Sequence, residues 1–359
     1  LYEMKVKYNC TQVDYKKYTT NLMKTYDKWL EPKTYRNRVQ HDGSTVMDKF
    51  SKLFGGKNPN VFKTAEMICL EEINGNPADW GLVELDPRTS FSKDDIDEII
   101  PQLEEILKGN GFFTKGPKVK EFEKLFAEYI GSNYGVAVNS CTSALELVLK
   151  TIGISGGDEV VVPTQTFVST ASCVVNNGGT PIFCEIDQNH LIDFDDLTAK
   201  ITDNTKAVII VHFGGLIHPD IWEIKKYLKE RNIYLIEDAA HAHGAKIDNI
   251  FAGNIGDFGC FSFYSTKIMT TGGEGGFIST NHEKLFDLCS SLGAIGIDNK
   301  TRNEIYINAG SNNRLTEFQA IMGISQLNRL ESFVKHRNRI AGVYKNNLSQ
   351  LAENGLIKF

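Results

Sequence analysis

A single lysine, Lys267, lies in a segment rich in small and hydroxyl residues, FSFYSTKIMTTGGEGG (261–276). An apolar stretch precedes it, and four glycines follow within nine residues. Most lysines are solvated surface charges, so this one could simply point to water from a loop. Small residues could instead let a bound group lie against the backbone, with the lysine as its covalent anchor. The rest of the chain has to decide between these two readings.

Two other polar clusters carry residue types that suit the same chemistry. In SCTSAL (140–145), Ser140, Thr142 and Ser143 occur where a strand turns into a helix. Hydroxyls and free N–H groups at a helix N-terminus form a phosphate site, although an ordinary N-cap would look the same. In YLIEDAAHAHG (234–244), Glu237 and Asp238 end an apolar strand. Buried carboxylates are costly without a cationic partner, although a helix N-cap aspartate would also fit.

Together these clusters are the parts that pyridoxal 5'-phosphate (PLP) needs. A lysine forms its Schiff base, a carboxylate keeps its pyridine nitrogen protonated, and a polar cradle holds its phosphate. Ser262 lies just before Lys267 and could join that cradle. The order of cradle, carboxylate and lysine along the chain is that of the aspartate-aminotransferase-like fold.

The elements that must position these residues follow a strand–helix alternation from about residue 134. Seven apolar runs predict strands, at 134–140, 159–164, 180–186, 206–213, 233–239, 258–263 and 275–280. Continuous apolar runs with helices between them predict a mostly parallel sheet that is covered on both faces. In such sheets, ligands bind at the carboxyl ends of the strands.

Helical patterns surround and connect the strands. They cover residues 92–111, 118–131, 142–153, 165–176, 220–231 and 317–351. Ser92 and Asp95 have the spacing of a capping box, and Pro101 predicts a kink in the first helix. Residues 118–131 carry an apolar stripe that includes Phe122 and Phe126.

Composition excludes several classes of protein. The formal charge of −6 over 359 residues argues against a general binder of nucleic acid or anionic membranes. No apolar run is as long as a membrane span, so no membrane partner is expected. The seven cysteines are an odd number without a C-x-x-C pair, and Cys184 and Cys260 fall in predicted strands. We therefore expect buried reduced thiols, no metal site and a cytoplasmic protein.

Residues 92–350 closely resemble the DegT–StrS group of PLP-dependent sugar aminotransferases. The matching stretches occur in the family's order and include NSCTSALELVL, GDEVVVPTQTFVSTA, IEDAAHAHGA, GDFGCFSFYSTK, TTGGEGGFIST and SNNRLTEFQAIMGISQL. The resemblance implies a type I PLP-dependent transferase fold, with the seven-stranded sheet and helices on both faces, followed by a small C-terminal domain. Each stretch is weak evidence alone, but their joint order over roughly 260 residues is specific.

The resemblance also implies a role for individual residues. Lys267 matches the Schiff-base lysine, and Asp238 matches the carboxylate on the pyridine nitrogen. His241 matches the residue placed against the cofactor ring and its 3-oxygen. The phosphate contacts are Thr142, Ser143 and Ser262. Phe167 matches the aromatic residue that stacks on the ring, and Asn312 matches a residue that reaches the partner subunit's phosphate in a homodimer with shared active sites.

Some features depart from the family pattern. Cys141 stands where the family usually has glycine, beside the phosphate cradle. The family's arginine- or histidine-containing loop, which helps to bind the substrate, appears here as residues 291–303. Because this loop departs from the family pattern, the substrate is not identified. Residues 1–88 form an N-terminal extension of unknown role. We expect a large PLP-binding domain at 89–285 and the start of a small C-terminal domain, cut short, at 286–359.

The expected function is transfer of an amino group from an amino acid, with glutamate as the favoured donor, to a nucleotide-linked keto sugar. Two alternatives stay open. A sugar dehydratase of the same family carries histidine in place of the lysine, so Lys267 argues against it. A non-catalytic regulator or scaffold would not need the pair of Lys267 and Asp238.

Overall fold

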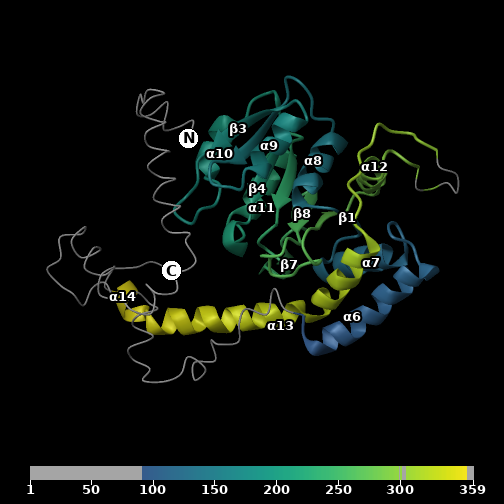
Figure 1. The fold of residues 1–359 in the computed structure, drawn as a ribbon. Helices are drawn as coiled ribbons and strands as arrows, with labels where there is room; N and C mark the ends of the chain where they lie inside the picture. Colours follow the sequence, from purple (N-terminus) through teal and green to yellow (C-terminus); the bar gives the residue numbers. More distant parts are fainter. Residues whose placement is uncertain (1–90, 299, 301–304, 354–359) are drawn as a thin grey trace, which may run out of the picture. The chain divides into compact units, whose positions relative to one another are not determined.

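The structure is a computed structural model that describes residues 91–298, 300 and 305–353 (Figure 1). The extension expected over residues 1–88 lies outside the described residues. The expected boundary after residue 285 falls inside a helix, Glu283–Gly293. The division into a large and a small domain therefore stays a prediction.

A seven-stranded sheet forms the centre of the described chain. In spatial order its strands are β1 (Tyr134–Val138), β9 (Gly276–Thr280), β8 (Phe258–Ser262), β5 (Tyr234–Asp238), β4 (Thr205–Val211), β2 (Glu159–Pro163) and β3 (Thr180–Cys184). Only β9 is antiparallel to its neighbours, and the other pairs are parallel. All seven predicted strands and the mostly parallel sheet are confirmed. A short hairpin of β6 (Lys246–Ile247) and β7 (Ile250–Phe251) was not predicted.

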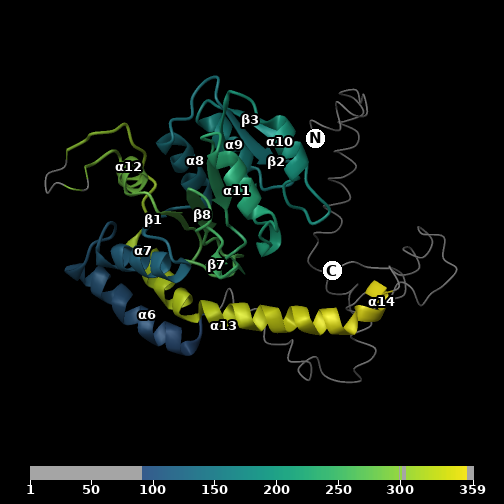
Figure 2. The ribbon, with the colours of Figure 1, turned by 180° about the vertical axis from the view of Figure 1, so that it is seen from behind.

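Helices cover both faces of this sheet, as Figures 1 and 2 show from opposite sides. One face packs against α7 (Pro117–Ile130), α10 (Phe194–Lys200), α11 (Ile221–Lys229) and the first half of α13 (Glu317–Asn347). The other face packs against α8 (Cys141–Thr151), α9 (Ser169–Asn176) and α12 (Glu283–Gly293). The helices α10 and α12 were missed by the sequence prediction, which left their residues without a helical assignment.

Strand alternation explains why two cores form. Val161 faces the core that contains α7 and α11, whereas its neighbours Val160 and Val162 face the core that contains α8 and α9. Successive side chains of a strand point to opposite faces, so a continuous apolar run fills both layers. Cys184 and Cys260 are fully buried free thiols in β3 and β8, as expected.

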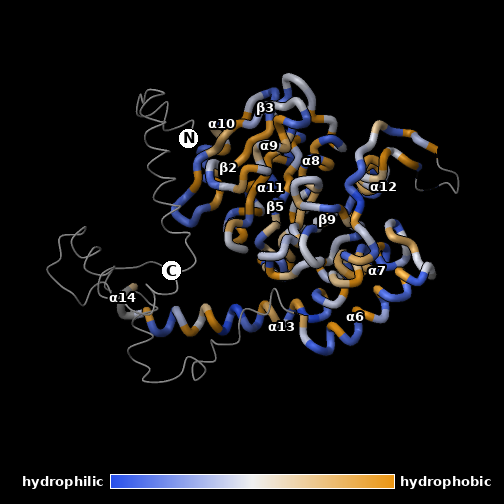
Figure 3. The backbone as a smooth tube through the Cα atoms, viewed as in Figure 1, coloured by the Kyte–Doolittle hydropathy of each residue, from blue (hydrophilic) through white to orange (hydrophobic). Residues whose placement is uncertain are grey.

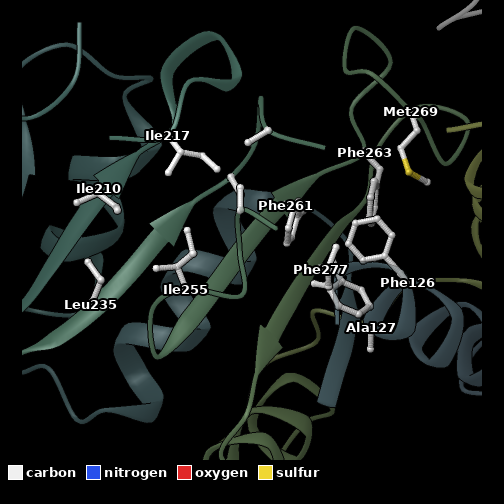
Figure 4. Close-up of a cluster of buried hydrophobic side chains, with 14 of the residues drawn as sticks. Phe126, Ala127, Ile210, Ile217, Leu235, Ile255, Phe261, Phe263, Met269 and Phe277 are labelled. Carbon is white, nitrogen blue, oxygen red and sulfur yellow. The ribbon is translucent and has the colours of Figure 1, made fainter. Parts of the chain in front are cut away.

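An aromatic cluster joins α7 to the edge of the sheet that carries β8 and β9 (Figure 4). The ring of Phe126 lies edge-on to Phe261, Phe263 and Phe277, with centroids 5.1, 5.2 and 4.8 Å away. Edge-to-face contacts at these distances are favourable beyond the area they bury. The apolar stripe predicted on residues 118–131 is thus the face that docks α7.

Polar side chains set the ends of the outer helices. The capping box of Ser92 and Asp95 begins α6 (Lys93–Glu105), as predicted. Asp95 also accepts from Ser325 and pairs with Arg329, so α6 is tied to α13. Pro101 lies within α6, which continues to Glu105 and gives way to a π-helical turn, η3 (Ile106–Asn110).

The helix predicted over 317–351 is in fact two helices. A capping box of Thr316 and Gln319 begins α13, which ends at Asn347, and α14 (Ser349–Glu353) follows. In Figure 3, the outer half of α13 alternates hydrophilic and hydrophobic residues. Among the residues that the structure describes, no helix is both long and apolar enough to cross a bilayer.

Two acidic residues connect α7 to α13 and to β1. Glu317 is buried and accepts hydrogen bonds from the backbone N–H groups of Gly116, Lys118 and Val119, which cap the start of α7. Glu123 accepts a 2.9 Å hydrogen bond from the Ala137 N–H in β1. The pKa of Glu123 is raised to about 7, chiefly by burial; the Ala137 hydrogen bond opposes the rise and the nearby Glu317 adds to it.

Glu123 should make stability depend on pH near neutrality. Its folded pKa of about 7 lies above the ordinary value of 4.5, so its protonated form contributes stability at low pH that is lost as the pH rises through 7. A neutral Glu123→Gln side chain should therefore stabilise the fold at pH 8 by about 1–2 kcal/mol and by little at pH 5. Urea unfolding at both pH values measures this.

The exposed Glu128→Gln variant, on the same helix, serves as the control. An equal effect of Glu123→Gln at both pH values would show that the carboxyl does not titrate differently on folding.

Candidate active site

Six of the eight predicted site residues converge at one edge of the sheet. Val138 at the end of β1, Gly276 at the start of β9 and Ser262 at the end of β8 lie side by side in register. The next strand, β5, ends at Asp238 on the same edge, because β5 and β8 are parallel. A cavity of about 540 Å³ lies here. Its lining includes the predicted residues Thr142, Phe167, Asp238, His241, Ser262 and Lys267.

Lys267 enters the cavity from the loop between β8 and β9. Its backbone N–H donates to the Tyr264 carbonyl at 2.9 Å, and the N–H of Ser265 donates to Gly273 at 3.0 Å, so the loop folds back on itself. The side chain is half-buried, and no ion pair within 4.0 Å joins it to any described carboxylate. Burial lowers the pKa of Lys267, while the charge of Asp238 partly opposes this. A lower pKa leaves more of the amine neutral and nucleophilic near pH 7.

Asp238 is buried at the end of β5. Its Oδ2 accepts from Thr170 Oγ1 at 2.9 Å, and its Oδ1 accepts from the Ala240 N–H at 3.2 Å. Burial raises the pKa of Asp238, and the two hydrogen bonds, His241 and Lys267 work in the opposite direction. The carboxylate is therefore only partly compensated by the protein.

Glu237, the other half of the acidic pair, has a different environment. It is fully buried and accepts from the backbone N–H groups of Gly253, Ile255 and Gly256 at 2.6–2.7 Å. His212 Nε2 lies 2.8 Å from it. These backbone N–H groups compensate much of the carboxylate charge, for which we expected a cationic partner. Glu237 does not line the cavity.

The N-terminus of α8 forms the other wall. The Ser140 hydroxyl accepts from the Ser143 N–H as an N-cap and donates to the Ser143 hydroxyl at 3.0 Å. Ser143 is therefore engaged with the cap and does not line the cavity, whereas Thr142 and Ser140 do. The Thr142 hydroxyl lies 2.7 Å from the Ser169 hydroxyl in α9. The start of α8 presents N–H groups that have no partner in the preceding turn, which suits an anion.

A glycine holds the lysine loop against this helix N-terminus. A Cβ built on Gly276 would meet the backbone of Ser140 and lie 2.7 Å from the Cys141 nitrogen. Since neither backbone segment can move freely, only glycine fits. The glycines after Lys267 therefore allow the lysine loop and the cradle to approach each other.

Aromatic side chains complete the cavity. Phe167 is 74% exposed and lines the cavity, so its ring is accessible to a bound ligand. The ring of His241 lies 6.1 Å from that of Phe213, and burial, followed by the charge of Lys267, lowers its pKa. Neutral His241 can accept as well as donate a hydrogen bond.

Asn312 lies apart from the cavity of its own chain. It is exposed, pairs with Ala294 in an isolated bridge, and accepts from Arg314 Nε at 2.9 Å. Its predicted role in a partner's site stays a prediction.

Sequence reasoning missed several residues around the site. The cavity is also lined by Thr166, Ser169, Phe213, Tyr264 and Glu274. Thr170, in α9, donates a hydrogen bond to Asp238. The hydroxyl residues were visible in TQTFVST, where Thr166 and Thr170 are four apart. Their position beside Asp238 could not be predicted from the sequence, because it depends on β2 and β5 ending at the same edge of the sheet.

The residues present fit pyridoxal phosphate. Four groups border one cavity: a half-buried amine with no described carboxylate in ion-pair range, an incompletely compensated carboxylate, an exposed aromatic ring and an open helix N-terminus. These correspond to the aldehyde, ring nitrogen, ring face and phosphate of the cofactor.

Comparison with known proteins agrees with a site for pyridoxal phosphate. The profile of the DegT/DnrJ/EryC1/StrS aminotransferase family matches residues 93–359. The chain therefore belongs to this family, a class of α/β enzymes, and its recognition from the sequence motifs is confirmed.

Particular relatives are similar over about two thirds of their own length. The spore coat polysaccharide biosynthesis protein SpsC of Bacillus subtilis is 40% identical over 271 residues, which cover 73% of this chain and 68% of SpsC. GDP-perosamine synthase of Caulobacter vibrioides is 39% identical over 237 residues, covering 66% of this chain and 63% of that enzyme. A dTDP-3-amino-3,4,6-trideoxy-alpha-D-glucose transaminase of Micromonospora megalomicea is 33% identical, covering 68% of this chain and 65% of that enzyme.

Solved structures share the fold. An aminotransferase from Psychrobacter cryohalolentis has a TM-score of 0.70 and 33% identity, over 75% of this chain and 70% of that one. NtdA from Bacillus subtilis, solved with bound cofactor PMP, has a TM-score of 0.67 and 30% identity, over 74% and 60% of the two chains. The predicted type I fold is confirmed.

The close approach at Gly276 gives a test of this site. In Gly276→Ala, the added Cβ should push the α8 N-terminus away from the lysine loop. We expect a loss of about 1–3 kcal/mol in unfolding free energy and much weaker binding of pyridoxal phosphate. Chemical denaturation and fluorescence titration measure the two effects.

Gly156→Ala is the matched control, because nothing lies within 4 Å of a Cβ there. If Gly276→Ala bound the cofactor as tightly as the control, the cradle and the lysine loop would not depend on each other.

Proposed function

We propose that this chain is a PLP-dependent aminotransferase that transfers an amino group from an amino acid to a nucleotide-linked keto sugar. The observation that carries the proposal is that Lys267, which forms no ion pair with a described carboxylate, and the under-compensated Asp238 face one cavity beside an open helix N-terminus. The relatives named GDP-perosamine synthase and dTDP-aminosugar transaminase support the substrate class.

The bound cofactor supplies an electrophilic carbon and a ring that withdraws electrons from the reacting bonds. Lys267 Nζ would hold the cofactor covalently, and its free amine would serve as the base and acid that moves a proton from and to the Cα of the amino donor. Asp238 would hold the proton on the ring nitrogen. Thr142, Ser262 and the α8 N-terminus would hold the phosphate, Phe167 would stack on the ring and His241 would contact its 3-oxygen.

We propose glutamate as the amino donor and the cytoplasm as the compartment. Free thiols at all five described cysteines support a reducing compartment. Lys267 argues against the dehydratase alternative, because that family branch carries histidine at this position. The scaffold alternative predicts a protein without turnover.

Substitution of the lysine separates these functions. Lys267→Ala should lower transamination by about 10³-fold or more, because both covalent attachment and proton transfer are lost. It should also abolish the visible absorbance of the bound cofactor. Spectra and single-turnover assays with glutamate measure both, and wild-type protein should lose its yellow colour on adding glutamate.

The exposed Lys206→Ala is the control. Turnover by Lys267→Ala close to that of this control would overturn the assignment, and a colourless, inactive wild type would favour the scaffold.

We further propose a homodimer in which each chain completes the other's site. Asn312 is exposed and lies outside the cavity of its own chain, which suits a contribution across an interface. Cyclic symmetry would place both copies equivalently.

Mixing two inactive variants tests the shared site. A heterodimer of Lys267→Ala and Asn312→Ala chains holds one site with both native residues and one with neither. Activity should rise on mixing toward about half of the wild-type value per heterodimer formed. Light scattering reports the assembly, and an active monomer would contradict the proposal.

A further inference from the structure

Two threonine hydroxyls form a chain of hydrogen bonds that ends at Asp238. Thr170 Oγ1 is 2.9 Å from Asp238 Oδ2, and Thr166 Oγ1 is 2.7 Å from Thr170 Oγ1. Thr170 is fully buried in the first turn of α9, whereas Thr166 borders the cavity. The hydroxyl chain thus runs from the cavity wall to the back of the carboxylate.

The direction of these hydrogen bonds follows from proton count. An ionised carboxylate only accepts, so Thr170 must donate its single proton to Asp238. Thr170 can then only accept from Thr166, which therefore donates. Protonation of Asp238 would remove the need for this donor. The arrangement accordingly favours the ionised form of Asp238.

The remaining surroundings of Asp238 show why such a donor matters. Apart from Thr170, its oxygens receive the Ala240 N–H at 3.2 Å and face the Cys141 sulfur at 4.0 Å. Other titratable groups near it are His241 on its own loop, Lys267 between β8 and β9, Cys173 in α9 and Cys260 in β8. Burial disfavours the charged carboxyl, and Lys267 offers no ion pair to offset that penalty. Thr170 makes the shortest hydrogen bond to it.

We propose that Thr170 is a positioning residue of this enzyme: oriented by Thr166, it keeps Asp238 ionised and fixes its Oδ2, leaving the remaining lone pairs for the cofactor's ring nitrogen. This inference rests on the proposed function, in which Asp238 faces that nitrogen. The same turn carries Ser169, whose hydroxyl meets Thr142 of the cradle. One turn of α9 therefore orients groups for both the phosphate and the ring.

The first arm of the test uses the full chain freed of cofactor. Difference infrared spectroscopy follows the carboxyl stretch of Asp238 against pH, with Asp238→Asn as the blank. Thr170→Val removes the donor at nearly constant shape and should move the titration midpoint upward by about one pH unit. Thr170→Ser should restore it, and Thr166→Val should move it less.

The second arm adds pyridoxal phosphate and follows binding by fluorescence at pH 8. Thr170→Val should weaken binding by about tenfold, and should have no further effect when Asp238 is already Asn. Thr151→Val is the control, since Thr151 is also buried and donates to a backbone carbonyl, that of Leu147, far from the site.

The two arms fail in distinguishable ways. A Thr170→Val titration that coincides with that of Thr151→Val overturns the positioning role. A shifted titration with unchanged cofactor binding supports the hydrogen-bond chain but overturns the placement of Asp238 at the ring nitrogen, and with it the proposed function.

Discussion

Two adjacent carboxylates buried at the end of the central strand β5 are the constraint on which the site depends. Neighbouring residues of a strand point to opposite faces, so Glu237 and Asp238 cannot share partners. Leaving a buried charge uncompensated costs several kcal/mol, and the protein must supply donors to each. It supplies them unequally: three backbone N–H groups and His212 surround Glu237. Asp238 accepts only one hydrogen bond from a hydroxyl and one longer hydrogen bond from a backbone N–H. The deficit at Asp238 is what a cationic ring nitrogen can fill.

The antiparallel strand β9 sets the spacing of the other groups. It lies between β1 and β8, so the α8 N-terminus and the lysine loop follow strands that are two positions apart. Strands are spaced at about 4.8 Å, which separates the two strand ends by roughly 10 Å. The cradle, Ser262 and Asp238 then follow one another along the edge of the sheet. Gly276 at the start of β9 permits this approach, because a side chain there would meet the backbone of Ser140.

Much of the architecture could be predicted from the sequence because it follows from local patterns. Continuous apolar runs identified all seven strands, and the capping box at Ser92 identified the start of α6. The short helix α10 was missed because its seven residues, FDDLTAK, are too few to show a helical period. The end of α13 was placed four residues late, since helix ends depend on weak local signals.

The candidate site residues were assigned from the sequence because their motifs occur together in the family's order. Taken alone, Lys267 could be a surface lysine and Asp238 a helix N-cap. Ser143, a further predicted phosphate contact, does not line the cavity, and its hydroxyl accepts from the N-cap Ser140, so its role stays a prediction. Thr170 could not be assigned, since its partner Asp238 is 68 residues away and only the parallel pairing of the sheet brings them together.

The features that serve binding are also those that leave the empty cavity less stable than a closed core would be. Phe167 exposes most of its ring, Lys267 has no ion pair among the residues that the structure describes, and Asp238 accepts few hydrogen bonds. Each is an unfavourable term in the protein alone and a favourable contact once a phosphate-bearing aromatic cation is bound. A ligand that binds only the folded state stabilises it in proportion to its affinity. The glycines and hydroxyl residues at this edge of the sheet therefore keep these groups facing the cavity, although the chain would be more stable if they were paired or buried. Cofactor binding then offsets this cost in folding stability.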